Sequence, residues 1–227
     1  MKFIKRDKKN IFYRANDIGD ISDKTLAGVK WPAETRNLKI LLRKNTLGAY
    51  KTLKENVSSK YIVRLCYSVA KSKLRVAGPR RITPGISLGL VSNEDTAKAL
   101  FVKTQSQFFL VPWAEYIDHQ YLTDFSVFVR DFLPKAETVV TSKLGEPVSL
   151  LTLFNQGKGK SLIAWIWISS LLTKAERQTV HYKLMRWVRK ASSKKIVASV
   201  HSFNTRSNRF FERVGFTPSY IWVTRKP

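Results

Sequence analysis

Apolar residues recur at helical spacing in the first third of the chain. Between residues 37 and 69 they lie three and four positions apart, which is typical of amphipathic helices. The spacing predicts one helix from Asn37 to about Val57 and a second that begins at Ser58 or Ser59. The apolar stripe of the second helix consists of Ile62, Leu65, Cys66 and Val69. We therefore expect Cys66 to be a small buried side chain.

The segments on either side lack this spacing. The first 35 residues are polar, with turn signals such as Ile18-Gly19-Asp20, and predict an irregular basic arm. The run from Gly78 to Gly85 contains two prolines and two glycines, which predict an exposed loop or a boundary. We therefore expect a basic extension over residues 1–85, made of an arm and two helices, ahead of a domain over residues 86–227.

Beyond residue 85, strands and helices follow one another in a regular order. Short runs bounded by glycine or proline predict strands, and longer amphipathic runs predict helices. The predicted elements are a strand at 86–91, a helix at 95–104 capped by Asn93, a loop at 108–120, a helix from Thr123 to Pro134, strands at 138–143, 148–154 and 162–168, a helix at 174–191, a strand at 196–200, a short helix at 204–214 and a strand at 219–224. The three consecutive strands predict an antiparallel meander. The fold class is therefore α/β (α+β), with a mixed, mostly antiparallel sheet flanked by helices.

Charge changes what this folded chain is expected to bind. Its 227 residues are 44% hydrophobic and 12% aromatic, which indicates a packed core rather than disorder, yet the formal net charge is +25. Residues 1–90 hold 21 Lys or Arg against 6 Asp or Glu, and residues 173–227 hold 13 against 2, whereas residues 91–172 hold 7 against 8. Nucleic acid is the leading candidate partner, because phosphates attract Lys and Arg at any sequence. A basic solvated surface without such a partner is the alternative.

Six basic residues are candidates for the contact with nucleic acid. Four lie on the polar side of the helix predicted at 174–191 and two lie in the loop before residue 85: Lys183, Arg186, Arg189, Lys190, Arg80 and Arg81. No helix-turn-helix, zinc-finger or RNA-binding signature occurs in the sequence. DNA, RNA and an acidic protein therefore all stay open as partners.

The number of cysteines, the spacing of the histidines and the length of the apolar runs argue against several other classes of protein. One cysteine forms no internal disulfide, which fits a reducing compartment, and we expect a cytoplasmic protein. No segment reaches the roughly 18 to 20 uncharged apolar residues that span a bilayer, and we expect neither a membrane protein nor a secreted one. The three histidines are 62 and 20 residues apart, a spacing that fits no metal site.

The end of the chain carries the most specific motif. Asn204 is followed by Ser207, the aromatic pair Phe210-Phe211 and the turn Gly215-Phe216. This stretch, together with the order of elements from residue 86 onward, resembles the GNAT superfamily of N-acetyltransferases. The likeness covers about 140 of the 227 residues. Core packing of a helix on a sheet is an independent reason for the apolar residues of the motif.

The resemblance implies an acyl-CoA cofactor, such as acetyl-CoA, at the start of the long helix. In the family, the pyrophosphate lies on the free backbone amides of that helix end, where two small residues allow close approach. Here both glycines of the motif are missing: Val180 and Tyr182, or Thr179 and His181 in the other alignment, stand in their places. By resemblance, the cofactor-binding residues are Ile168, Ser169, Arg177, Thr179, Val180 and Asn204.

The family's usual proton donor is also replaced. A tyrosine in the closing helix protonates the leaving thiolate in many members, and its position here is Phe211. The groups that remain for proton transfer near the implied cleft are His201, Ser202, His181 and Tyr182. Asp118 and His119 lie on the loop at 108–120, where Trp113, Tyr116 and Tyr121 are candidates for stacking on a base. A structural role is the alternative for each of these side chains.

Three functions fit these observations. The first is an atypical N-acyltransferase that acts on nucleic acid or on a nucleic-acid-associated target, for which phage-type DNA-modification enzymes are an analogy. The second is a catalytically inactive member of the fold that binds nucleic acid or a partner protein through its basic surface. The third is a structural part of a nucleoprotein assembly, in which the basic arm orders on binding.

Overall fold

A computed structural model describes residues 1–6, 11–29, 31, 37–43, 47–109, 129–130 and 133–225. The chain divides into two compact units. The first unit consists of Met1–Val69 and Ala198–Pro227, and the second of Ala70–Val197. Strand β9 (Lys195–His201) contributes to both. The predicted loop at 108–120 and the helix predicted from Thr123 fall mostly outside the described residues.

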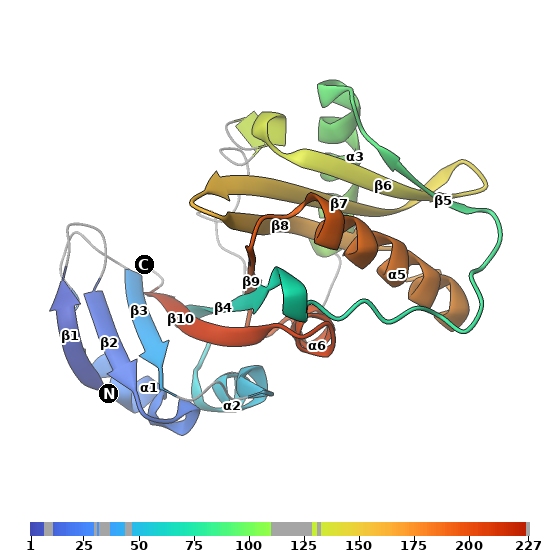
Figure 1. The fold of residues 1–227 in the computed structure, drawn as a ribbon. Coiled ribbons are helices and arrows are strands. Elements are labelled where there is room, and N and C mark those ends of the chain that lie inside the picture. Colours follow the sequence, from blue (N-terminus) through green and yellow to red (C-terminus); the bar gives the residue numbers. More distant parts are fainter. Residues whose placement is uncertain are drawn as a thin grey trace. The chain divides into compact units, whose positions relative to one another are not determined.

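The first unit is built on a mixed sheet (Figure 1). Its strands lie in the order β1, β2, β3, β10, β4, and their bounds are Lys2–Arg6, Ile11–Ala15, Asn37–Leu42, Thr217–Arg225 and Tyr61–Ala70. The β2–β3 pair is parallel, and the β1–β2, β3–β10 and β10–β4 pairs are antiparallel. The amino-terminal strands and the last strand of the chain therefore share one sheet.

The two faces of this sheet differ. One face carries the buried residues of successive strands, among them Ile11, Ile40, Val63, Leu65 and Ile221. Helix α6 (Thr205–Arg213) packs on this face, where the Phe211 ring stacks on Tyr67. Helices α1 (Asp23–Ala27) and α2 (Ala49–Asn56) add the buried residues Leu26 and Leu53. Along β2, β3 and β10, the buried residues therefore lie on one side of the sheet.

The predicted extension of an arm and two helices is wrong in most of its elements, although residues 49–56 of the first predicted helix do form helix α2. Residues 2–6 and 11–15 are strands, residues 37–42 are strand β3, and residues 61–70 are strand β4. Strand β4 is buried on both faces, so its apolar residues form a nearly continuous run rather than an alternation. Such a run cannot be distinguished from a buried helix by spacing. Cys66 is buried as expected, and burial raises the pKa of its thiol.

The second unit contains the predicted antiparallel meander. Strands β5 (Ile86–Leu90), β6 (Glu137–Lys143), β7 (Glu146–Gly157) and β8 (Lys160–Ile168) pair in sequence order. The β7–β8 hairpin turns through Lys158 and Gly159, with φ angles of 49° and 72°. Positive φ at both central residues is the type I′ geometry that suits the twist of a two-residue hairpin.

Two helices cover opposite faces of the meander (Figure 1). Helix α3 (Glu94–Phe109) begins at the predicted cap, where the Asn93 Oδ1 accepts the Thr96 N–H at 3.0 Å, and its Phe101 packs near Trp165. Helix α5 (Lys174–Ala191) has the predicted bounds and buries Val180, Leu184, Met185 and Val188. The mixed, mostly antiparallel architecture flanked by helices is therefore confirmed.

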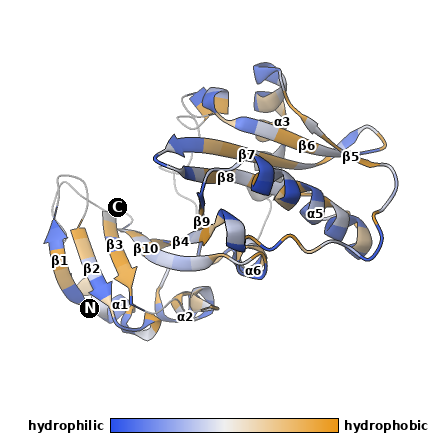
Figure 2. Cartoon of the chain, viewed as in Figure 1, coloured by the Kyte–Doolittle hydropathy of each residue, from blue (hydrophilic) through white to orange (hydrophobic). Residues whose placement is uncertain are grey.

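Hydropathy follows these layers. Figure 2 shows hydrophobic colour over most of β3, where Leu38 and Ile40 are completely buried. Among the helices in the described part of the chain, none is both long and apolar enough to cross a membrane.

Candidate functional site

The start of helix α5 is closed by the protein's own side chains. Thr173 and Glu176 form a capping box in which the Thr173 hydroxyl accepts the Glu176 N–H. The Glu176 carboxylate accepts the Thr173 N–H at 2.8 Å and the Thr173 hydroxyl at 2.9 Å, and its other oxygen lies 2.6 Å from the Lys143 Nζ. A carboxylate therefore already occupies the positive end of the helix dipole.

The first turns of α5 are also covered from the side. The segment between β4 and β5 passes this helix, and the Thr83 N–H donates to the Thr179 hydroxyl at 3.0 Å. The two threonine hydroxyls lie 3.2 Å apart, and Thr179 and Val180 are completely buried. The Arg177 guanidinium donates to the Leu172 carbonyl at 2.9 Å, so it braces the preceding loop.

The positions from Arg177 to Tyr182, where the sequence places the cofactor motif, do not fit a cofactor pyrophosphate. Helix α5 runs from Lys174 through Tyr182 without a break, and the Arg177 N–H already donates to the Thr173 carbonyl at 3.0 Å. Backbone amides inside a helix have partners and cannot bind phosphate oxygens. The implied cofactor residues Arg177, Thr179 and Val180 thus serve the helix and its packing, while Ile168 and Ser169 end β8 and follow it.

We expect the capping carboxylate to make stability depend on pH. The Lys143 ammonium, together with the Thr173 donors, lowers the pKa of Glu176 to about 2. The stabilisation is therefore complete above the ordinary carboxyl pKa and is lost as the pH falls through about 2. Glu176→Gln should unfold at lower urea concentration than the parent protein at pH 6, and the difference should vanish near pH 2. A constant difference across this range, measured in urea titrations, would contradict the placement of Glu176.

His181 and Tyr182 lie further along α5 and are partly exposed. The Arg186 guanidinium donates to the Tyr182 hydroxyl at 3.4 Å, and the Tyr182 ring lies beside Gly78 of the preceding segment. Both side chains belong to the second unit.

His201 and Ser202 lie in the first unit, at the end of β9. Burial lowers the pKa of His201 to about 3, and the positive charge of Arg64 contributes. The imidazole is therefore neutral at physiological pH, and its ring stacks on Phe203 with a centroid distance of 4.9 Å. Ser202 is buried, and its N–H donates to the Val63 carbonyl at 2.8 Å. Both residues thus have packing and pairing roles.

The closing motif builds a buried network that the sequence did not indicate. Asn204 caps helix α6, where its Oδ1 accepts the Ser207 N–H at 3.0 Å. Asn208 is completely buried, and its Nδ2 lies 2.9 Å, 3.3 Å and 2.8 Å from the carbonyl oxygens of His201, Ser202 and Asn204. The Tyr67 hydroxyl donates to the Asn208 Oδ1 at 3.0 Å. Asn208 therefore fixes the turn between β9 and α6.

Phe211 stands where the family has its tyrosine, and a tyrosine from another element lies against it. Tyr67 stacks on the Phe211 ring with a centroid distance of 6.0 Å, and its hydroxyl also lies 3.4 Å from the Glu212 carboxylate. Burial, together with the Glu212 charge, raises the pKa of Tyr67. A completely buried phenol that donates to Asn208 is a structural group rather than a proton donor to a substrate.

The predicted nucleic-acid contacts differ in their surroundings. Arg186, Lys190, Arg80 and Arg81 are exposed, and Lys183 is partly exposed. The Arg189 guanidinium donates to the Leu74 carbonyl, so it ties the segment before β5 to the helix.

A basic cluster of the second unit gathers three segments that are distant in sequence. The Lys71 ammonium donates to the carbonyl oxygens of Ser192 at 2.7 Å and Lys190 at 3.3 Å, which caps the end of α5. The Lys195 N–H donates to the Gly159 carbonyl at 2.9 Å, which brings the β7–β8 turn to the same place. We call this the basic end of α5, and its members are Lys71, Lys73, Arg75, Lys158, Lys160, Arg189, Lys190, Lys194 and Lys195.

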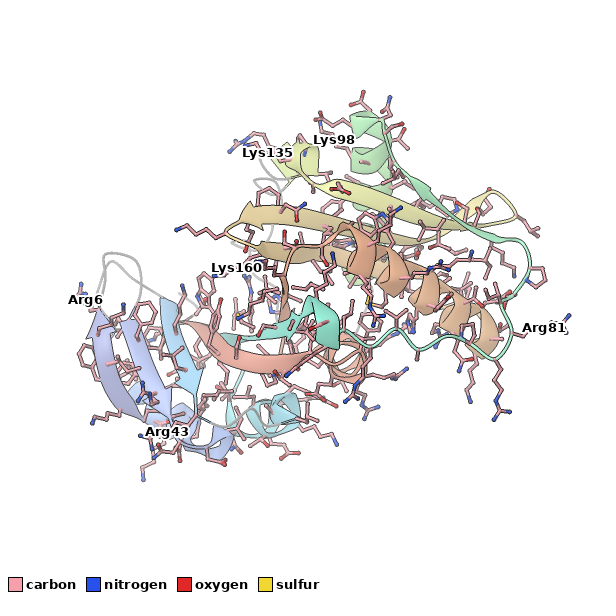
Figure 3. The ribbon with its side chains drawn as sticks, in the orientation of Figure 1. Arg6, Arg43, Arg81, Lys98, Lys135 and Lys160 are labelled. Carbon is pink, nitrogen blue, oxygen red and sulfur yellow. The ribbon has the colours of Figure 1, made fainter. Side chains whose placement is uncertain are left out.

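Of the residues at the basic end of α5, the sequence predicted only Arg189 and Lys190 as contacts to nucleic acid. A signal was present, because residues 56–93, 147–175 and 177–211 contain no Asp or Glu. No described carboxylate forms an ion pair with Lys158, Lys160 or Lys194. Figure 3 labels Lys160 of the basic end of α5. Lys98 and Lys135, which are also labelled, belong to the same unit but not to this cluster.

The candidate residues fall into two sets. His201, Ser202 and Asn204 belong to the first unit, and the residues from Ile168 to Tyr182 belong to the second. Asp118, His119 and the three aromatic residues of the 108–120 loop lie outside the described residues. Over the ranges that are described, no group of three His, Cys, Asp or Glu side chains is arranged to hold a metal ion.

The chain is similar to solved structures, but its sequence matches neither a family model nor a curated protein. A functionally unknown conserved protein from Staphylococcus epidermidis has a TM-score of 0.50 at 13% identity, with 84% of this chain and 73% of that chain covered. This likeness concerns the fold.

Two of the similar structures have names that state a family. A GCN5-related N-acetyltransferase from Kribbella flavida has a TM-score of 0.48 at 10% identity, and the match covers 84% of this chain and 68% of that chain. A tandem GNAT protein from the clavulanic acid biosynthesis pathway has a TM-score of 0.49 at 10% identity, with 84% and 65% covered. The solved structures similar to this chain thus include members of the superfamily that its closing motif resembles.

Proposed function

We propose that this chain is a nucleic-acid-binding protein on an acyltransferase-type fold, and that the basic end of α5 is its binding surface. The observation that carries the proposal is the gathering of nine Lys and Arg from three segments, whose sequence neighbourhoods contain no acidic residue. Cations that lie close together without acidic neighbours repel one another, and a bound polyanion removes this repulsion. Binding is also favoured because the Lys and Arg side chains release the counter-ions condensed on the phosphates.

The cluster is held by backbone contacts, which favours a binding role. The Ser193 N–H donates to the Ser161 hydroxyl at 2.8 Å, and the Lys71 N–H donates to the Lys194 carbonyl at 2.8 Å. Lys158 has a positive φ at the tip of its hairpin, a conformation that glycine or asparagine adopts at lower cost than lysine. Lys158 is thus exposed at the tip of the β7–β8 hairpin.

The composition of the surface favours nucleic acid over a membrane. The large hydrophobic side chains that the described residues expose most, such as Leu144, Leu171 and Leu90, belong to other segments. A membrane-surface site requires apolar side chains that insert beside the cations. Cations without exposed apolar neighbours are typical of contacts to a phosphate backbone.

Acyl transfer to nucleic acid, or to a target bound to it, is the second candidate function. It is favoured by His181 and Tyr182, which are partly exposed on α5, whereas Ser202 is buried and the ring of His201 stacks on Phe203. The self-capped start of α5 argues against acyl-CoA as the donor in the family's usual manner.

A filter-binding series against salt tests the proposal. We expect binding of duplex or single-stranded oligonucleotides at low salt, with log affinity falling against log salt at a slope of about −4 or steeper, because each phosphate contact adds about −0.7 to −0.9. Calorimetry on the same sample should detect no acetyl-CoA binding up to millimolar concentration. A shallow slope, or no binding, would overturn the nucleic-acid proposal, and micromolar acetyl-CoA binding would favour the acyltransferase instead.

A further inference from the structure

A row of alternating cations and aromatic rings crosses the sheet of the first unit. Strand pairing places Lys5 opposite Phe12, Phe12 opposite Lys39, Lys39 opposite Trp222, and Trp222 opposite Arg64. Residues directly opposite in paired strands point to the same face of a sheet. The row therefore lies on one face and runs through β1, β2, β3, β10 and β4.

On β2, β3 and β10 this face is the one opposite the hydrophobic core, whereas on β4 the neighbours of Arg64 on the same face, Ile62 and Cys66, are buried. The neighbours of the row along each strand, such as Ile11, Leu38, Ile40 and Ile221, are buried and point to the other side. Phe12, Lys39 and Trp222 are partly exposed, and Lys5 is exposed. A sheet face that carries large rings without burying them is not explained by core packing.

The cations lie against the rings. The Lys39 Nζ is 4.8 Å from the centre of the Trp222 ring and 5.7 Å from that of Phe12, and the Lys5 Nζ is 5.1 Å from the Phe12 ring. These distances are typical of cation–π contacts. Phe12 and Trp222 are separated by one strand, so the rings lie about 10 Å apart along the row.

A basic hollow lies beside the row. Its volume is about 300 Å³, and its lining residues are Met1, Lys2, Arg14, Asn16, Asp20 and Arg43. Arg14 is two residues from Phe12 on β2 and so points to the same face. The Asp20 carboxylate accepts the backbone N–H groups of Asn16 and Asp17, both at 3.1 Å. The hollow is thus lined by three basic side chains, Lys2, Arg14 and Arg43, and by one carboxylate, Asp20, which is already hydrogen-bonded to the backbone.

We propose that this face binds single-stranded nucleic acid, with bases on Phe12 and Trp222 and phosphates on Lys5, Lys39 and the Arg14 hollow. The inference rests on the proposed nucleic-acid-binding function and adds a second surface that recognises unpaired bases. Aromatic side chains stack on exposed bases of any sequence, while neighbouring cations contact the backbone. In a duplex the bases are stacked on one another, so the rings contribute nothing to duplex binding.

The test compares single-stranded and duplex oligonucleotides by fluorescence anisotropy, with separate oligo-dT and oligo-U arms of about 12 nucleotides. Phe12→Leu and Trp222→Leu should each weaken single-strand binding by about 5-fold or more and leave duplex binding unchanged. Phe3→Leu is the matched control, because Phe3 is 54% exposed on β1 but pairs with Tyr13 and so points to the other face. This variant should bind like the parent protein.

The possible results distinguish failure of the stacking surface from failure of the proposed nucleic-acid-binding function on which it rests. If the parent protein binds no oligonucleotide, the proposed function fails. If it binds but the two ring variants bind single strands as tightly as the parent, only the stacking surface is overturned. Photocrosslinking of the parent protein to 5-iodouracil oligonucleotides covers the case in which a variant fails to fold. Crosslinks in the peptides of Phe12 or Trp222 support the inference, and crosslinks confined to other peptides contradict it.

Discussion

Replacing Asn208 by leucine is expected to lower the free energy of unfolding by about 3 to 5 kcal/mol. The side-chain amide is completely buried and shares its two N–H donors among three backbone carbonyls between β9 and α6, while its oxygen accepts the Tyr67 hydroxyl. Leucine has a similar volume but no polar atoms, so every hydrogen bond of the Asn208 side chain would be lost. The His201 and Asn204 carbonyls would keep their backbone N–H donors, whereas the Ser202 carbonyl and the Tyr67 hydroxyl would lose the bonds to Asn208. Each buried polar group left without a partner costs about 1 to 3 kcal/mol.

Urea unfolding followed by circular dichroism measures this change, and Asn204→Ala is the control. Asn204 caps the same helix through one bond from the Ser207 N–H, so its loss should cost only about 1 kcal/mol. Equal losses for the two variants would show that Asn208 has no larger role than an ordinary cap. The network would then not be what fixes the turn after β9.

The sequence predicted the second half of the chain well because its elements have distinct local signals. The β6–β7 and β7–β8 hairpins turn at glycines, and α5 follows the cap residue Thr173 and ends before a pair of serines. Strand β4 lacked such a signal. As a central strand between β10 and β9 it is apolar on both faces, and its spacing happened to match that of a helix.

The candidate site was predicted less well, because it depends on contacts between distant residues. Tyr67 and Asn208 are 141 positions apart, and nothing local in either segment indicates their bond. The same holds for Lys71, which is 121 positions from the Ser192 carbonyl that it caps. The missing glycines did indicate the altered start of α5, but its own carboxylate cap became visible only in the structure.

The second large expected effect is a loss of nucleic-acid affinity when charge is removed from the basic end of α5. Changing Lys158, Lys160, Lys194 and Lys195 together to glutamine should weaken nucleic-acid binding about 100-fold at moderate salt, because each lysine displaces counter-ions from a phosphate. All four are exposed, so the fold should be unaffected. The matched control changes the exposed Lys51, Lys54, Lys60 and Lys135 to glutamine. Both variants lose four charges, so any difference between them comes from position.

The salt dependence of duplex binding, measured for the parent protein and these two variants, tests the account most directly. For the variant of the basic end, the slope of log affinity against log salt should become shallower by about 3 to 4. The control should keep nearly the parent slope and affinity. Equal losses of affinity in the two variants would show that net charge alone drives binding. Unchanged affinity in the variant of the basic end would show that the basic end of α5 is not the nucleic-acid surface.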